Sequence, residues 1–332
     1  MDAKPVVFGI GNPLIDVVIQ ARDEDLQSLG IDKGIMQLVT EERQQEILAH
    51  FDGVERVFRP GGAAPNTMVA LAGLGVPAVI SGMIGNDDFG RTYEEQVLGS
   101  GVASRLHPGD GMTGSSVILV TPDGERSMNT HLGMCQEFSP DALDTDLLRQ
   151  ARFLYFTGYM WDTDLQKRAI RRAIAVAREE EISVVFDLAD PFAVNRYRDD
   201  FLELLENDVD VVFANQRETE LLYGCSSPEE CAGKLGEHVS LAAMKIGKDG
   251  SIVVDHGRQE HAPSRPIRAT DSTGAGDMYA AGFLAAFANG KSAVDAAKAG
   301  GHLAEEIIQI IGAQFTTEDI PGVRDRMKGL LQ

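Results

Sequence analysis

The sequence predicts an α/β protein of three layers, with helices on both faces of a central, mostly parallel sheet and a small second β-sheet beside it. Short apolar runs alternate with helical patterns along most of the 332 residues, as expected where crossover helices join parallel strands. With 43% hydrophobic residues, the chain can bury a large core. We expect residues 1–332 to form one domain, because no linker of biased composition divides them.

The strands of the main sheet are expected where short apolar runs occur. These runs are residues 6–10, 78–84, 153–156, 183–186, 209–213, 242–246 and 252–254. A Lys248-Asp249-Gly250 turn separates the last two runs, which predicts a hairpin at the edge of the sheet. One further strand-like run is expected to end near Thr270.

Helices are expected between these runs and after them. Residues 66–74 and 89–98 have helical composition, and residues 165–177 place apolar side chains on one helical face. The last helices are expected to begin at Ala275, Ser292 and Thr317.

Two pairs of segments alternate polar and apolar residues like strands of a half-exposed sheet. They are residues 14–20 with 34–39, and residues 115–120 with 126–131 across a Pro122-Asp123-Gly124 turn. Because each pair follows a strand of the main sheet, we expect a small lid built from two insertions, approximately residues 13–40 and 108–134. Such a lid would lie above the strand ends, where ligands of open α/β sheets bind.

The charge of the chain argues against some classes of partner. A formal net charge of -21 disfavours nucleic acid, because phosphate backbones require clustered Lys and Arg. No stretch reaches the roughly 20 apolar residues of a membrane span, so no membrane partner is expected. The segment Met1-Asp2-Ala3-Lys4-Pro5 has no targeting pattern, and a cytoplasmic location is expected.

The three cysteines are Cys135, Cys225 and Cys231. They form no CxxC pair and no zinc-binding pattern with histidine. We therefore expect three reduced thiols, without a disulfide and without a structural metal.

The most chemically informative stretch is Asp271-Ser272-Thr273-Gly274-Ala275-Gly276-Asp277. Gly274 and Gly276 let the main chain approach a ligand closely, and free amides at the start of the following helix can hold a phosphoryl group. Asp277 can accept the proton of an attacking hydroxyl, and the helix start is expected to keep it ionised. The alternative is a helix cap that follows a glycine turn.

Four sequence motifs follow one another along the chain. They are Gly61-Gly62-Ala63-Ala64-Pro65-Asn66, Gly85-Asn86-Asp87-Asp88-Phe89-Gly90, Asn215-Gln216-Arg217-Glu218 and the stretch from Asp271 to Asp277. In these motifs the chain resembles the ribokinase or PfkB-type carbohydrate kinases over nearly its full length. The resemblance implies a ribokinase-like fold and transfer of the γ-phosphoryl group of ATP to an alcohol.

The resemblance also implies the roles of the residues around the last motif. Asp277 would be the catalytic base, and the amides of Gly274, Ala275 and Gly276 would form an anion hole. Fixed donors of this kind stabilise charge on the transferring group with little reorganisation. Some relatives need K+ near this motif, and its loop offers carbonyl groups, so K+ is a candidate cofactor beside ATP and Mg2+.

On the ATP side, Glu218 with Asn215 resembles the pair that organises Mg2+ and its waters near the phosphates, and oxygen ligands suit that ion. The alternative for Glu218 is an ordinary carboxylate in a first helical turn. The segment from Lys245 to Gly250 lies where relatives often have Thr-x-Gly beside the phosphates. Lys245, Gly247 and Gly250 are therefore expected to bind ATP, while Lys245 or Lys248 supplies charge or stands in a solvated turn.

On the acceptor side, the segment from Gly11 to Asp16 resembles the adenosine kinase branch of the family. In that branch the matching Asp grips ribose hydroxyls, and one carboxylate can accept two hydrogen bonds from a diol. Asp16 is therefore the expected substrate anchor, together with Asn12. Because Gly61 and Gly62 have no side chain, the main chain could approach the sugar closely there. Asn66 would form hydrogen bonds with the same sugar ring.

An apolar set from the lid and the core could enclose a flat base. Its members are Leu14, Met36, Leu132 and Tyr159. The alternative is that these side chains pack on one another. Arg126, also in the lid, either reaches the ATP phosphates on closure or lies at the surface of a hairpin.

The expected activity is therefore transfer from ATP to the primary 5′-hydroxyl of a nucleoside, with adenosine the favoured acceptor. The alternatives are a kinase of a free sugar such as ribose or fructose, and a non-catalytic regulator that binds nucleoside or sugar. Gly109-x-Gly111-x-x-Gly114 formally matches a dinucleotide-binding fingerprint, but it precedes a strand-like run instead of a helix. The sequence leaves monomer and homodimer both open.

Overall fold

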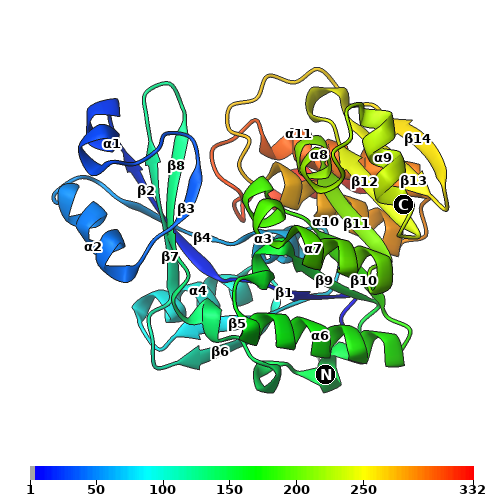
Figure 1. The fold of residues 1–332 in the computed structure, drawn as a ribbon, viewed down its shortest axis with the longest axis horizontal. Coiled ribbons are helices and arrows are strands. Elements are labelled where there is room, and N and C mark those ends of the chain that lie inside the picture. The colour runs from blue at the N-terminus through cyan, green and yellow to red at the C-terminus, as the bar shows by residue number, and fades with distance from the viewer. Residues whose placement is uncertain (1–3) are drawn as a thin grey trace.

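The computed structural model describes residues 4–332; residues 1–3, part of the segment without a targeting pattern, lie outside the described residues. Within them, the main sheet has nine strands in the order β14-β13-β12-β11-β10-β9-β1-β5-β6 (Figure 1). The strands are β1 (Val7–Ile10), β5 (Ala78–Gly85), β6 (Ala103–Gly109), β9 (Phe153–Thr157), β10 (Ser183–Asp187), β11 (Val211–Asn215), β12 (Leu241–Lys245), β13 (Ser251–Asp255) and β14 (Arg258–Ala262). Neighbouring strands pair in parallel, except that β13 pairs antiparallel with β12 and β14.

Helices cover both faces of this sheet, as predicted. They are α3 (Ala63–Gly73), α4 (Asp88–Gly99), α5 (Thr145–Leu148), α6 (Asp164–Glu179), α7 (Pro191–Asn207), α8 (Gln216–Tyr223), α9 (Pro228–Gly236), α10 (Ala275–Ala288), α11 (Ala293–Ile307) and α12 (Ile320–Leu331). Successive side chains of a strand point to opposite faces, so Val7 of β1 joins one core cluster and Phe8 the other. Across residues 4–332, no helix is long and apolar enough to cross a membrane.

The smaller sheet joins two segments that are distant in sequence. Its order is β3-β8-β7-β2-β4, with β2 (Leu14–Gln20), β3 (Met36–Leu38), β4 (Val57–Gly61), β7 (Gly114–Val120) and β8 (Arg126–His131). The parallel pairing of β2 with β7 connects the two segments. Figure 1 shows this sheet at one side of the main body, with α1 (Asp23–Leu29) and α2 (Glu41–His50) beside it.

The smaller sheet extends beyond the predicted boundary of the first insertion. Strand β4 pairs antiparallel with β2, with Leu14 opposite Gly61. The predicted range of about 13–40 leaves this strand out, because Val57 to Arg59 is only three residues long before Pro60 interrupts the pattern. Residues 14–61 therefore contribute to the smaller sheet from the N-terminal side.

The strand expected to end near Thr270 is not formed. Residues 263–270 carry no strand, since Pro263 and Pro266 cannot donate to a sheet ladder. This segment is held instead at the end of α11, where the Thr270 amide donates to the carbonyl of Ile308, the C-cap of that helix, at 2.7 Å. It runs from β14 to the start of α10 without joining the sheet.

The expectation of three reduced thiols is also wrong. Cys225 and Cys231 form a disulfide with a Cα–Cα separation of 5.3 Å, while Cys135 is free and buried. Cys225 lies just after α8 and Cys231 lies in α9. The tight connection between these helices brings the two sulfur atoms together, and no CxxC spacing is needed for that.

Candidate active site

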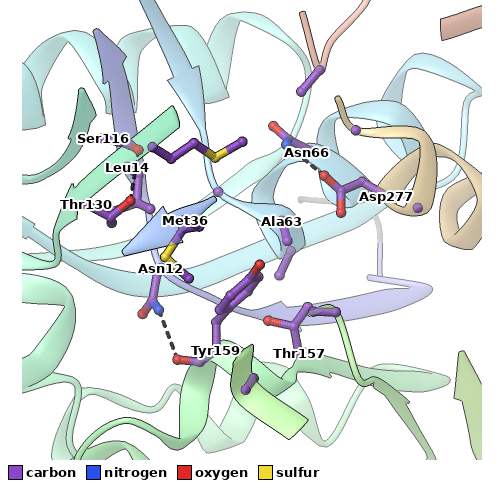
Figure 2. A pocket seen from close by; sticks show the side chains of 18 of the residues that line it. Asn12, Leu14, Met36, Ala63, Asn66, Ser116, Thr130, Thr157, Tyr159 and Asp277 are labelled. Atoms are coloured by element: carbon purple, nitrogen blue, oxygen red, sulfur yellow. Dashed lines mark hydrogen bonds between the residues drawn. The ribbon is translucent and has the colours of Figure 1, made fainter. Parts of the chain in front are cut away.

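A cavity of about 280 Å³ lies between the smaller sheet and the carboxyl ends of the main-sheet strands (Figure 2). Strands β2, β3, β7 and β8 supply one wall. The opposite wall comes from the segments after β1 and β9, from the starts of α3 and α7, and from the start of α10. This is the position at which ligands of open α/β sheets bind, and the volume suits a small molecule.

The predicted anion hole lines this cavity at the start of α10. Gly274 is the N-cap with φ of 75°, and a side chain there would lie 2.8 Å from Ala313. The first amides of a helix have no partner within it, and the positive end of the helix dipole favours an anion. One of the three predicted amides, that of Ala275, already donates to the carbonyl of Ser272 at 3.2 Å.

Asp277 also lines the cavity and is held in place by Asn66, which Gln314 supports in turn. Asn66 Nδ2 donates to Asp277 Oδ2 at 2.8 Å, and Gln314 Nε2 donates to Asn66 Oδ1 at 2.8 Å. Figure 2 shows Asn66 and Asp277 turned toward each other. The predicted sugar ligand Asn66 thus orients the predicted base, and sequence reasoning did not find Gln314.

Asp277 is not kept ionised by the helix start, contrary to the expectation from its position. Burial raises the pKa of Asp277 to about 8, against the hydrogen bond from Asn66, and the nearby carboxyls of Asp187 and Asp16 raise it further. The desolvation of the carboxylate therefore outweighs the helix dipole, whose effect is small and confined to the first turn.

Asp16 reaches the same cavity from β2. Burial raises the pKa of Asp16 to about 7, and Arg126 and Arg59 oppose that rise. A side chain on Gly61 would lie 2.7 Å from the Asp16 carboxylate, and one on Gly62, which has φ of 95°, would lie 2.1 Å from the carbonyl of Asn12. These two glycines are therefore required by contacts within the protein itself.

Asn12 joins the segments that follow β1 and β9. Its Nδ2 donates to the carbonyl of Tyr159 at 3.1 Å, and its Oδ1 accepts from Gln166 at 3.0 Å. Asn12 and Tyr159 both line the cavity (Figure 2). The structure thus gives Asn12 a definite role in positioning Tyr159.

The cavity walls are mostly apolar. All four residues expected to enclose a base, Leu14, Met36, Leu132 and Tyr159, line it. Sequence reasoning missed a second apolar group, which comprises Leu38, Ile118, Met128, Phe192 and Ala193. The alternation in β7 and β8 was a signal for two of them, since Ile118 and Met128 occupy opposite positions in the ladder.

The ionisable side chains that line the cavity are all acidic. They are Asp16, Asp162 and Asp277, and no Lys or Arg lines the cavity within residues 4–332. Asp162 accepts from the hydroxyl of Tyr197 at 2.9 Å. Beyond these, the smaller sheet contributes the hydroxyls of Ser116 and Thr130, which lie 2.8 Å apart.

Five of the predicted ATP-binding residues lie outside this lining: Asn215, Glu218, Lys245, Gly247 and Gly250. Glu218 is 1% exposed, and its two carboxylate oxygens accept from the amide of Asn215 at 2.7 Å and from Asn215 Nδ2 at 2.5 Å. This is a capping box at the start of α8. Gly250 has φ of 97°, and a side chain there would meet the carbonyl of Ala262 at 2.1 Å.

Lys245 lies at the end of β12, next to the anion-hole turn. Its Nζ is 3.5 Å from Asp187 Oδ2, and it would lie 3.4 Å from a side-chain carbon on Gly276. Asp187 ends β10 and is 3% exposed. Sequence reasoning missed Asp187, although a charged residue directly after the apolar run 183–186 was a signal for it.

The smaller sheet touches the anion-hole region through two arginines. Arg126 Nη1 lies 2.8 Å from Asp271 Oδ2, and Arg59 Nη1 donates to the carbonyl of Ile311 at 2.8 Å. Asp271 also accepts from the amides of Thr273 and Gly312. Arg126 is thus not a loose hairpin residue, because it is bonded to the first residue of the last motif.

A family model described as pfkB family carbohydrate kinase matches residues 29–320. The chain belongs to the PfkB family. The sequence resemblance and the ribokinase-like α/β fold are both confirmed by this match and by solved structures of the same fold. The dinucleotide-binding interpretation is excluded for this PfkB kinase, because Gly109 ends strand β6 and Gly114 begins strand β7.

Solved structures similar to this PfkB kinase include the adenosine kinase from Sinorhizobium meliloti, with 34% identity, a TM-score of 0.90 and coverage of 98% of this chain and 100% of that one. A probable sugar kinase from Rhizobium etli CFN 42 has 32% identity and a TM-score of 0.91, covering 98% and 99%. The ATP-dependent ribose-1-phosphate kinase of Halopiger xanaduensis is 34% identical over 230 residues, which are 68% of this chain and 72% of that protein.

This PfkB-family protein is therefore a phosphotransferase with an alcohol group as acceptor, as the resemblance implied. Membership also implies the use of ATP, typically with Mg2+. The relatives include both adenosine and sugar kinases, so the acceptor has to be argued from the cavity.

Proposed function

We propose that this kinase transfers the γ-phosphoryl group of ATP to the primary 5′-hydroxyl of a nucleoside, with adenosine as the first choice. The observation that carries this proposal is the apolar wall of the cavity, to which Leu14, Met36, Ile118 and Leu132 contribute. A flat base would cover such a wall and remove its surface from water. The similarity to an adenosine kinase at 34% identity supports the same choice.

A free sugar fits the same cavity less well. Ribose or fructose could bond to Asp16, but its hydroxyls would then face apolar side chains and lose their hydrogen bonds to water. A sugar phosphate or sugar acid is disfavoured more strongly, because the lining within residues 4–332 has the carboxyl groups of Asp16, Asp162 and Asp277 but no Lys or Arg to pair with an anionic acceptor. The cavity therefore favours a neutral acceptor that carries a base.

Asp277 acts as the base in the proposed reaction. It takes the proton of the acceptor hydroxyl while the new bond from that oxygen to the γ-phosphorus forms. The bond between the γ-phosphorus and its bridging oxygen breaks, and ADP leaves. The amides at Gly274 and Gly276 stabilise the negative charge on the transferring group, and Asp16 accepts hydrogen bonds from the ribose diol.

Magnesium bound with ATP would add positive charge to the phosphates. Burial raises the pKa of Glu218 to about 7, and the carboxyls of Asp187 and Asp190 add to that rise. Glu218 would hold the ion through its waters, since oxygen ligands suit a hard cation. A requirement for K+ stays a prediction, tested by comparing initial rates in K+ and Na+.

A screen of ATP consumption with Mg2+ over nucleosides, ribose, fructose and ribose 1-phosphate tests the proposal. We expect kcat/KM for adenosine to exceed that for either free sugar at least about tenfold, from burial of the base. Asp277→Asn is the control, and its residual rate defines contaminating ATPase. Turnover of a sugar or a sugar phosphate without turnover of any nucleoside would overturn the choice of acceptor.

A further inference from the structure

Asp162 lines the cavity but has no part in the proposed reaction. It directly follows the short helical turn η3 (Gly158–Trp161), and its side chain is 11% exposed. Tyr197 and Phe192 of α7 line the cavity with it. Arg196, which pairs with Asp162, also lies over the Phe192 ring at 5.2 Å. The carboxylate of Asp162 therefore belongs to a part of the cavity that is otherwise aromatic and apolar.

Three donors hold the Asp162 carboxylate in one orientation. Oδ1 accepts from the Tyr197 hydroxyl at 2.9 Å and lies 3.2 Å from Arg196 Nη1. Oδ2 accepts from Gln136 Nε2 at 3.1 Å, and Gln136 belongs to the turn η1 (Gly133–Glu137). A carboxylate offers about four acceptor sites. The three partners within residues 4–332 therefore leave one site on Oδ2 open.

A ligand that bonds to this open site has to supply the proton. An ionised carboxylate only accepts hydrogen bonds. Burial, together with the negative charge of Asp162, raises the pKa of Tyr197 to about 12, so this phenol keeps the proton that it donates to Oδ1. The site thus fits an N–H or O–H group of a bound molecule.

Asp162 and the groups proposed to react lie at different parts of one cavity. Asp277 is held by Asn66 of α3, and Asp16 is close enough to raise the pKa of Asp277. These two carboxyls mark the part proposed for the ribose and its 5′-hydroxyl. Asp162 is bonded instead to η1 and α7. It therefore lies where the base of a nucleoside, rather than its ribose, would reach.

We propose that Asp162 is a specificity-determining residue, whose Oδ2 accepts a hydrogen bond from the exocyclic amino group of a purine nucleoside. This proposal rests on the proposed function, since it requires a nucleoside in the cavity. An amino group supplies the N–H that the open site needs. A purine with only a C–H at that position would cover the carboxylate oxygen without bonding to it, and sites of this kind discriminate strongly between such analogues.

The experiment compares kcat/KM for adenosine and for purine riboside, which has the same ring system without the amino group. The wild type is expected to prefer adenosine by about 10- to 100-fold, the range for one hydrogen bond to a charged group. Asp162→Leu should reduce this preference below about threefold, mainly through slower turnover of adenosine. Asp162→Asn should keep an intermediate preference, because its carbonyl oxygen still accepts.

The preference between the two nucleosides separates recognition from support of the fold. If Asp162 only tied η1 to α7, Asp162→Leu would slow both nucleosides equally, and an unchanged preference would overturn the proposal. Asp200→Leu is the matched control, because Asp200 accepts from Trp161 and Lys167 in the same region but lies outside the lining. It should keep the wild-type preference, and its loss there too would contradict the proposal.

Calorimetric titration of the two nucleosides without ATP gives the same comparison without turnover. Adenosine should bind the wild type at least about tenfold more tightly than purine riboside, and Asp162→Leu should bind both about equally. Wild-type protein that neither binds nor phosphorylates any nucleoside would overturn the proposed function and this proposal with it. Turnover of adenosine by the wild type without a preference over purine riboside would overturn only the role of Asp162.

Discussion

The carboxyl group of Asp277 lies where the proposed base has to act, but its buried surroundings favour the protonated form. Burial raises its pKa to about 8, while Asn66 donates a hydrogen bond of 2.8 Å to it. A base whose pKa is close to the working pH transfers protons efficiently. If Asp277 is the base, its strong burial therefore favours proton transfer, although burial lowers the stability of the ionised form.

Replacement of Asp277 by Asn should abolish turnover and stabilise the fold. The unfolded chain releases the proton near pH 3.8, whereas the native state keeps it up to about pH 8. The native state thus binds more protons in this window, and the free energy of unfolding falls as pH rises through it. Asn does not titrate, so the variant should melt a few degrees higher at pH 8, with a smaller gain at pH 5.

Melting curves at both pH values and kcat/KM against pH check this prediction. The wild-type kcat/KM should rise with pH to a plateau above about 8, if Asp277 is the base. Undiminished turnover in Asp277→Asn would remove Asp277 from that role. An equal gain in melting temperature at both pH values would contradict the shifted pKa.

Replacement of Asp16 by Ala should weaken binding of the acceptor without weakening binding of ATP. Loss of a charged hydrogen-bond partner for two hydroxyls is expected to raise the acceptor KM roughly 10- to 100-fold, with little change in the ATP KM. Steady-state kinetics with each substrate varied in turn measure both values. Asp32→Ala, at an exposed position of the same insertion, is the control, and equal changes in both KM values would exclude Asp16 as the ribose anchor.

The smaller sheet and the α10 turn are connected by one well-buried ion pair. Arg126 of β8 and Asp271 are 14% and 9% exposed in their side chains. Asp271 keeps further hydrogen bonds from Thr273 and Gly312. The anion-hole turn therefore has its own support, and the ion pair serves to hold the sheet over the cavity.

Arg126→Gln should leave the anion hole folded but let the smaller sheet open more often. We expect a several-fold higher acceptor KM and faster hydrolysis of ATP without acceptor, because closure excludes water from the site. Rates of ADP release with and without acceptor measure both effects. Arg105→Gln, which breaks a similar pair with Asp144 away from the cavity, is the control, and identical behaviour of both variants would exclude a latch.

Charge over the full chain acts against binding of a polyanion. The formal net charge is -21, so binding of ATP requires local positive groups, a role proposed here for the α10 amides. Like charges on the surface also repel one another and lower the stability of the compact state. Because salt screens charges, positive groups near the phosphates offset the repulsion from the net negative charge only over short distances.

Moderate salt should therefore stabilise this kinase. Raising NaCl from about 10 mM to 100 mM shortens the screening length from about 30 Å to about 10 Å, which weakens repulsion among surface carboxylates. We expect the melting temperature to rise by a few degrees, as measured by scanning calorimetry at pH 7.5. A fall in melting temperature would show that attractive ion pairs outweigh the net repulsion.

The α/β class, the second sheet and the PfkB motifs follow from the amino-acid sequence alone. Alternating apolar runs and glycine-rich turns are local patterns, and each predicts the secondary structure of its own segment. The sequence did not predict β4, the absence of a strand before Thr270, or the Cys225–Cys231 disulfide. These depend on neighbours that are distant along the chain or on a turn whose geometry no motif specifies.

How the site residues contact one another depends on how separate elements pack. Asn66, which Gln314 holds in turn, orients Asp277, Gly61 makes room for Asp16, and burial reverses the ionisation expected at a helix start. A motif specifies which groups are present. Their spacing, desolvation and mutual charge arise only when separate elements pack around one cavity, and these quantities determine the chemistry.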